Sequence, residues 1–368
     1  MQAVLFLLAL FFVVATALPL FRVPDWWVRI FDFPRLQLLA LGALTLGLYV
    51  GFYEIDTWAD YGMLGLVVVA LAYQLYKIWP YTRLHPKQAK NADHGDDSLT
   101  FRLVISNVLM ENRDVMKWRE VIEAARPDLV VAVETDQWWA DNTRGFEDEL
   151  PYVFRKPMDN TYGFLVFSRW PIGEVDVRYL VEEDVPSLWG AVEVPKGPPV
   201  KFTFIHPRPP RPDIFQDSHA RDAELVLVAE EIEGEEGPRV VAGDLNDVAW
   251  SYTTNLFQEI SGLLDPRIGR GLFSTFHADH VLLRWPLDHV FHSDDLRLVT
   301  IERLGHVGSD HFPMLVEFAY EPDGTEEQET PDADAEDREE AEEILEDAAE
   351  WKRQETPEEK REKQQKDR

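Results

Sequence analysis

The stretch Val240-Val241-Ala242-Gly243-Asp244-Leu245-Asn246 has the form of a buried β-strand that ends in polar residues. The apolar run predicts the strand, and the glycine permits a sharp exit from it. Asp244 and Asn246 are two residues apart, so they lie on the same side of an extended chain. Two interpretations are open for this pair: a turn stabilised by Asp and Asn, or a catalytic pair at the edge of a sheet.

Other segments repeat this design. Asp128–Val133 is a strand-like run that delivers Glu134, and Val200–Ile205 is another that delivers His206. The complete set of polar pieces beside strand-like runs is Asn107, Glu134, His206, Asp244–Asn246, Asp288 and Ser309–His311. Carboxylates and histidines gathered at one sheet edge suit metal-assisted cleavage of a phosphoester.

Two further pairings come from the same set. A buried carboxylate can fix the tautomer of an imidazole and stabilise its protonated form, so Asp288 and His311 are predicted to pair if their strands are neighbours. His206 is followed by a stiff, proline-rich loop with Arg208 and Arg211, which suit an anionic oxygen of the substrate. His289 faces away from Asp288 in an extended chain and is assigned no role.

Strand-like and helix-like segments alternate between residues 101 and 320, which predicts a layered α/β (α+β) domain. The expected strands are 101–106, 128–133, 162–168, 188–194, 200–205, 239–242, 287–292 and 313–319. The expected helices are 114–125, 214–231 and 250–259.

Composition excludes several kinds of chemistry. The chain has no cysteine, so disulfides, thiolate catalysis and cysteine zinc sites are absent. The formal net charge is −31, whereas sequence-independent binding of nucleic acid usually needs a basic surface. Nucleic acid is therefore possible but disfavoured as a partner.

Residues 1–80 predict a membrane anchor. Three apolar stretches, Val4–Phe21, Leu36–Tyr53 and Met63–Trp79, each approach the length of roughly 20 residues that a helix needs to cross a bilayer. Three buried core helices of a soluble domain are the alternative. The scarcity of polar faces favours about three transmembrane helices.

Flanking charge predicts the orientation of this anchor in the cell (inner) membrane. Arg22, Arg29 and Arg35 lie in or beside the first connection, and the second connection holds only acidic charges. The positive-inside bias then places the catalytic domain in the cytoplasm. The alternative is a signal peptide over residues 1–17, cleaved after Ala15-Thr16-Ala17, which leads to a periplasmic or extracellular domain.

Two segments flank the predicted domain. Residues 81–99 are polar and predict a linker, and residues 321–368 are rich in Glu and predict an acidic tail that is disordered or a transient helix. The tail is interpreted as a solvating segment, or alternatively as a site that recruits an unknown protein partner.

The ordered series of motifs resembles the endonuclease/exonuclease/phosphatase superfamily, which includes DNase I, abasic-site endonucleases, neutral sphingomyelinases and inositol polyphosphate 5-phosphatases. The series is Asn107, Glu134, Gly163 with Ser168-Arg169-Trp170-Pro171, His206, Gly243-Asp244-Leu245-Asn246, Asp288 and Ser309-Asp310-His311. It covers residues 101–320. The resemblance implies a four-layered DNase I-like sandwich of two mixed β-sheets flanked by helices, over residues 100–320.

The resemblance also implies roles. Glu134, with Asn107 and Asp310, would bind Mg²⁺ or Mn²⁺, ions that prefer such hard oxygen ligands. Asp244 would orient or deprotonate the attacking water, and Asn246 would hold the water or a phosphate oxygen. His311, supported by Asp288, would act as a base or as a charged stabiliser, and His206 would donate to the phosphoryl oxygen.

Together these features predict a membrane-tethered, Mg²⁺-dependent phosphoric ester hydrolase, a phosphodiesterase or a phosphatase. Its substrate is expected to be phosphorylated, and a lipid or headgroup fits the anchor. A Mg²⁺-dependent endonuclease or exonuclease is the alternative within the family. A non-catalytic membrane scaffold that recruits partners through its acidic tail is the alternative from another class.

Overall fold

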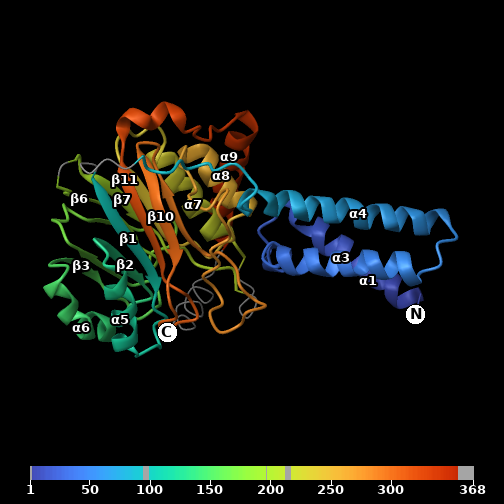
Figure 1. Cartoon of the computed structure of the whole chain (residues 1–368), viewed down its shortest axis with the longest axis horizontal. Coiled ribbons are helices and arrows are strands. Elements are labelled where there is room, and N and C mark those ends of the chain that lie inside the picture. The colour runs from blue at the N-terminus through green and yellow to red at the C-terminus, as the bar shows by residue number, and fades with distance from the viewer. Residues whose placement is uncertain (1, 94–98, 196, 212–216, 355–368) are drawn as a thin grey trace.

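The computed structural model describes residues 2–93, 99–195, 197–211 and 217–354. A rod of antiparallel helices projects from one side of a larger α/β domain (Figure 1). The rod comes from the N-terminal part of the chain.

The first sheet of the domain has six strands. Their order is β10 (Leu296–Arg303), β11 (Met314–Tyr320), β1 (Thr100–Asn107), β2 (Leu129–Val133), β4 (Phe164–Ser168) and β3 (Tyr152–Lys156). β1 and β2 are parallel, and the other neighbours are antiparallel. The sheet is therefore mixed, and the carboxyl ends of β1 and β2 meet at one edge.

The second sheet has five strands. Their order is β5 (Asp176–Arg178), β6 (Ser187–Val192), β7 (Val200–Phe204), β8 (Arg239–Asp244) and β9 (Asp288–His292). β7 and β8 are parallel, while β8 and β9 are antiparallel with Asp244 opposite Asp288. This register brings the end of one strand to the beginning of the next.

The two sheets face each other across the main core. Leu103, Ile105 and Val131 of the first sheet share one buried cluster with Phe202 and Val240 of the second. The outer face of the first sheet is covered by α5 (Val115–Ala125) and α6 (Gln137–Asn142), and that of the second by α7 (His219–Ile232) and α8 (Tyr252–Ser261). These four layers confirm the predicted sandwich.

All eight expected strands and the expected helices are present within a few residues, although residues 212–216, which include the predicted start of the helix 214–231, lie outside the described residues. Three strands were not expected from the sequence. β3 and β5 lie at sheet edges, where polar residues are tolerated on both faces. β10 contains an irregularity between Leu298 and Thr300 that breaks its alternation of apolar and polar residues.

The projecting rod consists of α1 (Gln2–Ala17), α3 (Arg35–Phe52) and α4 (Trp58–Ile78). With the short helices η1 (Leu18–Phe21) and η2 (Trp79–Tyr81), they give three segments long and apolar enough to cross a membrane. A capping box between Thr57 and Asp60 starts α4. The short helix α2 (Trp26–Arg29) lies in the first connection.

The predicted linker 81–99 is packed against the domain over much of its described length. The amide of Ala92 donates to the carbonyl of Leu298, and the amide of Leu298 donates to the carbonyl of Lys90. This pairing extends the edge of β10, so residues 90–92 are held by the sheet. The tract 94–98 lies outside the described residues.

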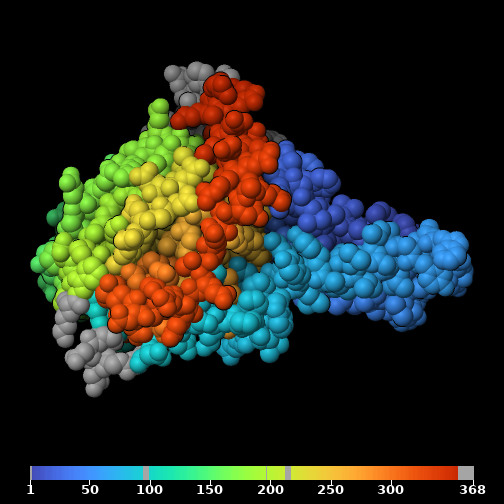
Figure 2. Space-filling model, turned by 90° about the horizontal axis from the view of Figure 1, so that it is seen from above, coloured from blue at the N-terminus to red at the C-terminus, as the bar shows by residue number. Residues whose placement is uncertain are grey.

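The acidic tail is not disordered throughout, contrary to the first of the two expectations. Residues Ala335–Gln354 form the helix α9, preceded by the short helix η5 (Pro322–Glu327). Ala341, Ile344 and Leu345 recur at helical spacing and join the cluster under α7 and α8. Figure 2 shows this segment crossing the surface of the domain. Residues 355–368 lie outside the described part.

Candidate active site

The ends of several strands meet at one edge of the two facing sheets. Asn107 is the last residue of β1, and Glu134 directly follows β2. Asp244 ends β8 and lies opposite Asp288, the first residue of β9. The segment Ser309–His311 precedes β11, whose Met314 pairs with Ile105 near the end of β1. The topology therefore brings polar residues from both sheets to one place.

Local backbone conformation directs two of these residues into the site. Glu134 has a φ of 59° and Asn246 a φ of 51°, values that residues other than glycine rarely adopt. Gly243, just before Asp244, has a φ of 153°, and a Cβ built on it would lie 1.8 Å from the carbonyl oxygen of Ile205. Only glycine fits this close approach of β8 to the end of β7.

Asn107 connects the two sheets. Its amide nitrogen Nδ2 donates to Oε1 of Glu134 at 2.7 Å and to Oδ2 of Asp244 at 3.0 Å, while its oxygen accepts from the amide of Leu109. The nitrogen, rather than the oxygen, thus faces the two carboxylates. In this arrangement Asn107 is a donor that holds Glu134 and Asp244 together.

His311 lies between two carboxylates. Its Nδ1 is 2.8 Å from Oδ2 of Asp288, and its Nε2 is 3.5 Å from Oδ2 of Asp244. Burial by itself lowers the pKa of His311, but Asp288 and Asp244 outweigh it and raise the pKa to about 10. The imidazolium form therefore dominates at neutral pH, with a proton on each ring nitrogen.

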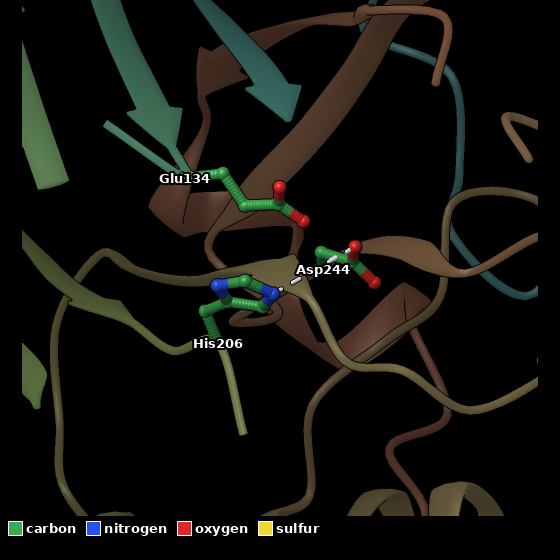
Figure 3. A group of neighbouring side chains, drawn as sticks. All are labelled: Glu134, His206 and Asp244. Atoms are coloured by element: carbon green, nitrogen blue, oxygen red, sulfur yellow. Dashed lines mark ion pairs between the residues drawn. The ribbon is translucent and has the colours of Figure 1, made fainter. Parts of the chain in front are cut away.

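His206 approaches Asp244 from the end of β7. Its Nε2 is 3.9 Å from Oδ2 of Asp244. Figure 3 shows this ion pair with Glu134 beside it. Burial lowers the pKa of His206 to about 4, against the opposing effect of Asp244. This histidine is therefore neutral, and its buried Nδ1 has no hydrogen-bond partner among the described residues.

The donor set fits a divalent cation. Glu134, His206 and Asp244 each offer one ligand atom, and these atoms lie within 4.8 Å of one another; the same holds for Asp244, Asp288 and His311. Burial, opposed by the hydrogen bond from Asn107, raises the pKa of Glu134 to about 7. A cation beside Glu134 would favour its charged form, because a buried carboxylate without a positive partner is costly.

Two other predicted residues lie at this edge with different surroundings. The side chain of Asn246 donates to the carbonyl of Pro207 at 3.0 Å, which ties it to the loop after His206. Asp310 is half-buried and contributes to the electrostatics of both Glu134 and His311. In the described chain Asp310 does not belong to either compact group of possible metal ligands.

Arg208 occupies a position that differs from the one predicted. Its buried guanidinium is 2.8 Å from Glu182 and 3.0 Å from Asp184, and it lies over the ring of Tyr162 at 4.9 Å. These contacts show that Arg208 holds the loop in place, and they do not direct its guanidinium toward the site of a bound anion. Arg211 is half-buried at the end of the same loop.

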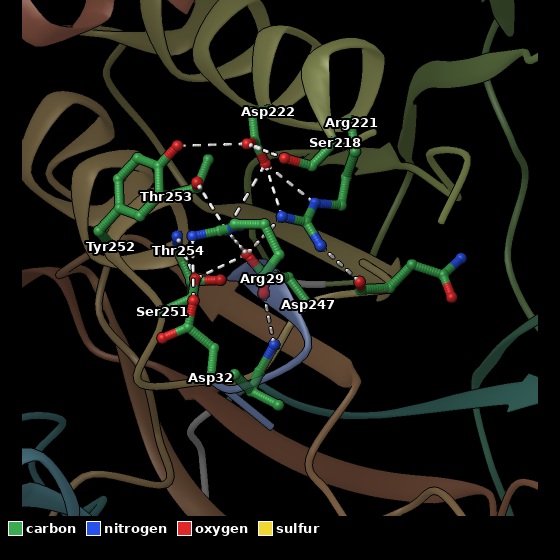
Figure 4. Close-up of polar contacts among 12 residues, drawn as sticks. Arg29, Asp32, Ser218, Arg221, Asp222, Asp247, Ser251, Tyr252, Thr253 and Thr254 are labelled. Carbon is green, nitrogen blue, oxygen red and sulfur yellow. Dashed lines mark hydrogen bonds and ion pairs between the residues drawn. The ribbon is translucent and has the colours of Figure 1, made fainter. Parts of the chain in front are cut away.

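Sequence reasoning missed a buried ion cluster behind the site (Figure 4). Arg29, from the connection between α1 and α3, lies 3.2 Å from Asp247 and 3.8 Å from Asp222. Arg221 pairs with Asp222 at 2.7 Å and donates to the backbone carbonyl of Asn246 at 2.9 Å. The cluster therefore joins the connection between α1 and α3 to the loop that follows Asp244.

No local signal in the sequence distinguishes these residues from surface charges. In the sequence, Arg29 indicated only positive charge beside the predicted spans. His289, which was assigned no role, is also structural, because its Nδ1 accepts from Arg267 at 2.7 Å and its Nε2 lies 2.9 Å from the carbonyl of Asp247.

Comparison with known proteins agrees with this geometry. The model of the endonuclease/exonuclease/phosphatase family matches residues 105–311. No curated protein matches the chain. Three similar solved structures are humanized TDP2 from D. rerio, the human Nocturnin catalytic domain and sphingomyelinase C from Streptomyces griseocarneus.

These three structures have sequence identities of 16%, 17% and 17% and TM-scores of 0.49, 0.49 and 0.43, respectively. Each covers 60% of this chain, and the match includes 98%, 94% and 99% of the solved chain. The family model spans more than half of the sequence and contains the strand ends described above. The chain therefore belongs to the endonuclease/exonuclease/phosphatase family.

Proposed function

We propose that this protein is a membrane-tethered, divalent-metal-dependent phosphoester hydrolase. The observation that carries the proposal is the position of Asp244, whose carboxylate is within 4 Å of Asn107, His206 and His311 at once. A buried carboxylate beside a charged imidazole suits the activation of water and the stabilisation of negative charge on phosphorus.

The protonation states assign different roles to the two histidines. Since the raised pKa of His311 keeps it charged, His311 would stabilise the negative charge that develops on the phosphoryl group. Asp288 holds the other ring nitrogen, Nδ1, at 2.8 Å. Asp244 would accept the proton of the attacking water, and neutral His206 would orient a phosphoryl oxygen.

A Mg²⁺ or Mn²⁺ ion would be held at Glu134, with Asp310 and Asn107 beside it, and when bound would supply positive charge to the leaving oxygen. The carboxylate-rich donor set supports a hard cation rather than a soft one. Asn107 would contribute either as the donor seen here or by turning its amide oxygen inward.

The three long apolar helices support a substrate in or near a bilayer, such as a phospholipid or a phosphorylated headgroup. Contacts between the first connection and the domain, among them Arg29 with Asp247, support a topology in which both lie on one side of the predicted spans. Two predicted spans lie between them, an even number that returns the chain to the same side, and this supports the cytoplasmic orientation that flanking charge favours. Protease added outside intact cells tests it.

The test of activity uses the full chain in detergent with Mg²⁺, Mn²⁺ or a chelator, and a panel of phospholipids, sugar phosphates, nucleotides and DNA. Asp244→Ala and His311→Ala should each lower turnover by about 10²–10⁴-fold with folding intact. Asp141→Ala and His85→Ala, outside the site, are the matched controls and should retain activity.

Hydrolysis of DNA in preference to every lipid would favour the nuclease alternative within the family. Absence of metal-dependent turnover on the whole panel, together with a loss of cellular function on removal of residues 321–368, would favour the scaffold instead.

A further inference from the structure

A cavity of about 840 Å³ lies where the anchor meets the domain. On the anchor side it is lined by Leu36 and Ala40 of α3 and by Tyr81 of η2. On the domain side it is lined by residues 270–274, by the loop around Leu282 and by the end of β10. None of the active-site residues described above is among its lining residues, so it is a separate feature.

Four arginines line this cavity: Arg83, Arg270, Arg284 and Arg303. In the described ranges of the chain, none of the four forms an ion pair with a carboxylate. The lining includes one acidic side chain, Glu302, which is exposed. This is notable in a chain of net charge −31, where acidic partners are abundant.

Three of these arginines are fixed by contacts that leave their charge uncompensated. Arg270 donates to the carbonyl of Ala89, Arg284 to that of Ala278, and Arg303 to that of Ser274. Arg284 and Arg303 also lie over the ring of Phe312, at 5.0 and 4.5 Å from its centre. The guanidinium groups are therefore positioned in advance, which reduces the entropy lost on binding an anion.

The electrostatics of the cavity favour an anionic ligand. Burial lowers the pKa of Arg270 to about 10, and burial together with the neighbouring Arg284 lowers the pKa of Arg303. For Arg270 the nearby carboxylate of Asp265, which pairs with Arg267, opposes the effect of burial without cancelling it, and for Arg303 both causes act against the positive charge. A phosphate group, with several charged oxygens, is among the ligands whose geometry matches guanidinium groups.

The position of the cavity indicates where such a phosphate comes from. The second and third predicted spans have their domain-side ends at Arg35 and Tyr81, next to the cavity. The loop beside it exposes 72% of Val281 and 81% of Leu282, and Gln37 of α3 donates to the carbonyl of Leu282 at 2.6 Å. An apolar loop tip alongside the start of a predicted span suits the depth where headgroups give way to acyl chains.

We propose that this cavity binds the phosphate headgroup of an anionic phospholipid, while Val281, Leu282 and the first turn of α3 contact its acyl chains. The inference rests on the membrane-spanning part of the proposed function, but not on catalysis. The bound lipid would fix the domain against the bilayer surface, with its active site held at a constant distance from the membrane.

The test places the full chain in nanodiscs of equal phosphatidylglycerol and phosphatidylcholine and counts retained lipids by native mass spectrometry. The wild-type chain should retain phosphatidylglycerol in preference to phosphatidylcholine. Arg284→Gln with Arg303→Gln should lower this preference by about fivefold for each arginine removed. Arg144→Gln with Arg155→Gln, which changes arginines near α6 and β3, is the matched control and should keep it.

A variant that cannot disturb folding keeps the test decisive. Arg83 is exposed and forms no hydrogen bond or ion pair with the residues that the structure describes, so Arg83→Gln should fold normally and still lower retention. Equal retention of both lipids by the wild type, or unchanged retention in Arg83→Gln and in the double variant, would overturn the proposal.

A competition with inorganic phosphate distinguishes a lipid headgroup from free phosphate as the ligand of this cavity. Displacement of phosphatidylglycerol by millimolar phosphate at the same site, without any effect of Val281→Ser with Leu282→Ser, would also overturn the lipid assignment. Hydrolysis is assayed separately on the same samples. Lipid retention without turnover would contradict the proposed function alone, and turnover without retention would contradict this inference alone.

Discussion

Replacement of Arg29 with methionine tests the buried cluster that joins the N-terminal helices to the α/β domain. Arg29 is 1% exposed and lies 3.1 Å from Asp32, 3.2 Å from Asp247 and 3.8 Å from Asp222. The cluster contains as many arginines as aspartates, with Arg35 and Arg221 beside Arg29. Methionine keeps much of the volume but leaves one buried negative charge without compensation.

Breaking a buried ion pair by removing one partner costs about 3–5 kcal/mol. In a domain of this size each kcal/mol lowers the melting temperature by roughly 2–4 °C, so we expect a decrease of roughly 6–20 °C. The assay is thermal unfolding of the full chain in detergent, followed by tryptophan fluorescence. Trp250, whose indole donates to the carbonyl of Asp32, is one of the reporting residues.

Arg22→Met is the matched control. Arg22 lies in the same connection and pairs with Glu340, but its side chain is 51% exposed. Exposed ion pairs contribute about 0–1 kcal/mol, so this variant should melt close to the wild type. If Arg29→Met melts no lower than Arg22→Met, the cluster does not hold the N-terminal helices and the domain together, and the reasoning from burial is refuted.

Three further predictions address other parts of the fold. Gly243→Ala should destabilise the domain by roughly 2–6 kcal/mol in denaturant unfolding, because of its φ and the contact with Ile205, while Gly173→Ala, with its nearest contact at 3.6 Å, should be mild. Burial, reinforced by Glu182, raises the pKa of Glu224 to about 8, so the folded chain keeps this proton up to about pH 8, while the unfolded chain loses it above about pH 4.5. The wild type therefore loses stability as the pH rises from 4.5 to 8. We expect Glu224→Gln to be more stable than the wild type by on the order of 2–4 kcal/mol at pH 8, with no gain at pH 4. Ile344→Asp with Leu345→Asp should detach α9 and increase hydrogen exchange of its backbone amides. Glu342→Ala with Glu346→Ala, on the exposed side of α9, is the control and should leave this exchange unchanged. Unchanged amide protection in the first variant would contradict the packing of α9 on α7.

Much of the fold was predictable because strands and apolar helices leave local patterns. The expected strands around Val131 and Val241 are buried on both faces and bounded by polar residues, so their position and their ends could be inferred. The helix α9 was not predicted as a packed element because its composition is dominated by glutamate, and the narrow stripe of Ala341, Ile344 and Leu345 gains stability only against α7 and α8.

The sequence by itself determined which chemical groups end the strands and which segments are apolar enough to cross a membrane. These are properties of short windows, set by side-chain period and composition. It also allowed the pairing of Asp288 with His311 to be anticipated, because both flank strands that a layered domain brings together.

Only the tertiary structure decided which of these groups meet and which are already satisfied. Arg208, expected to face the substrate, is instead paired with Glu182 and Asp184, while Arg284 and Arg303, which belong to no motif, line a cavity beside the N-terminal helices. A charged side chain gives no local sign of its partner, because ion pairs and cavities form between segments hundreds of residues apart, as Arg29 and Asp247 do. Burial and the distance between charges, which set their energies, exist only once the chain has folded.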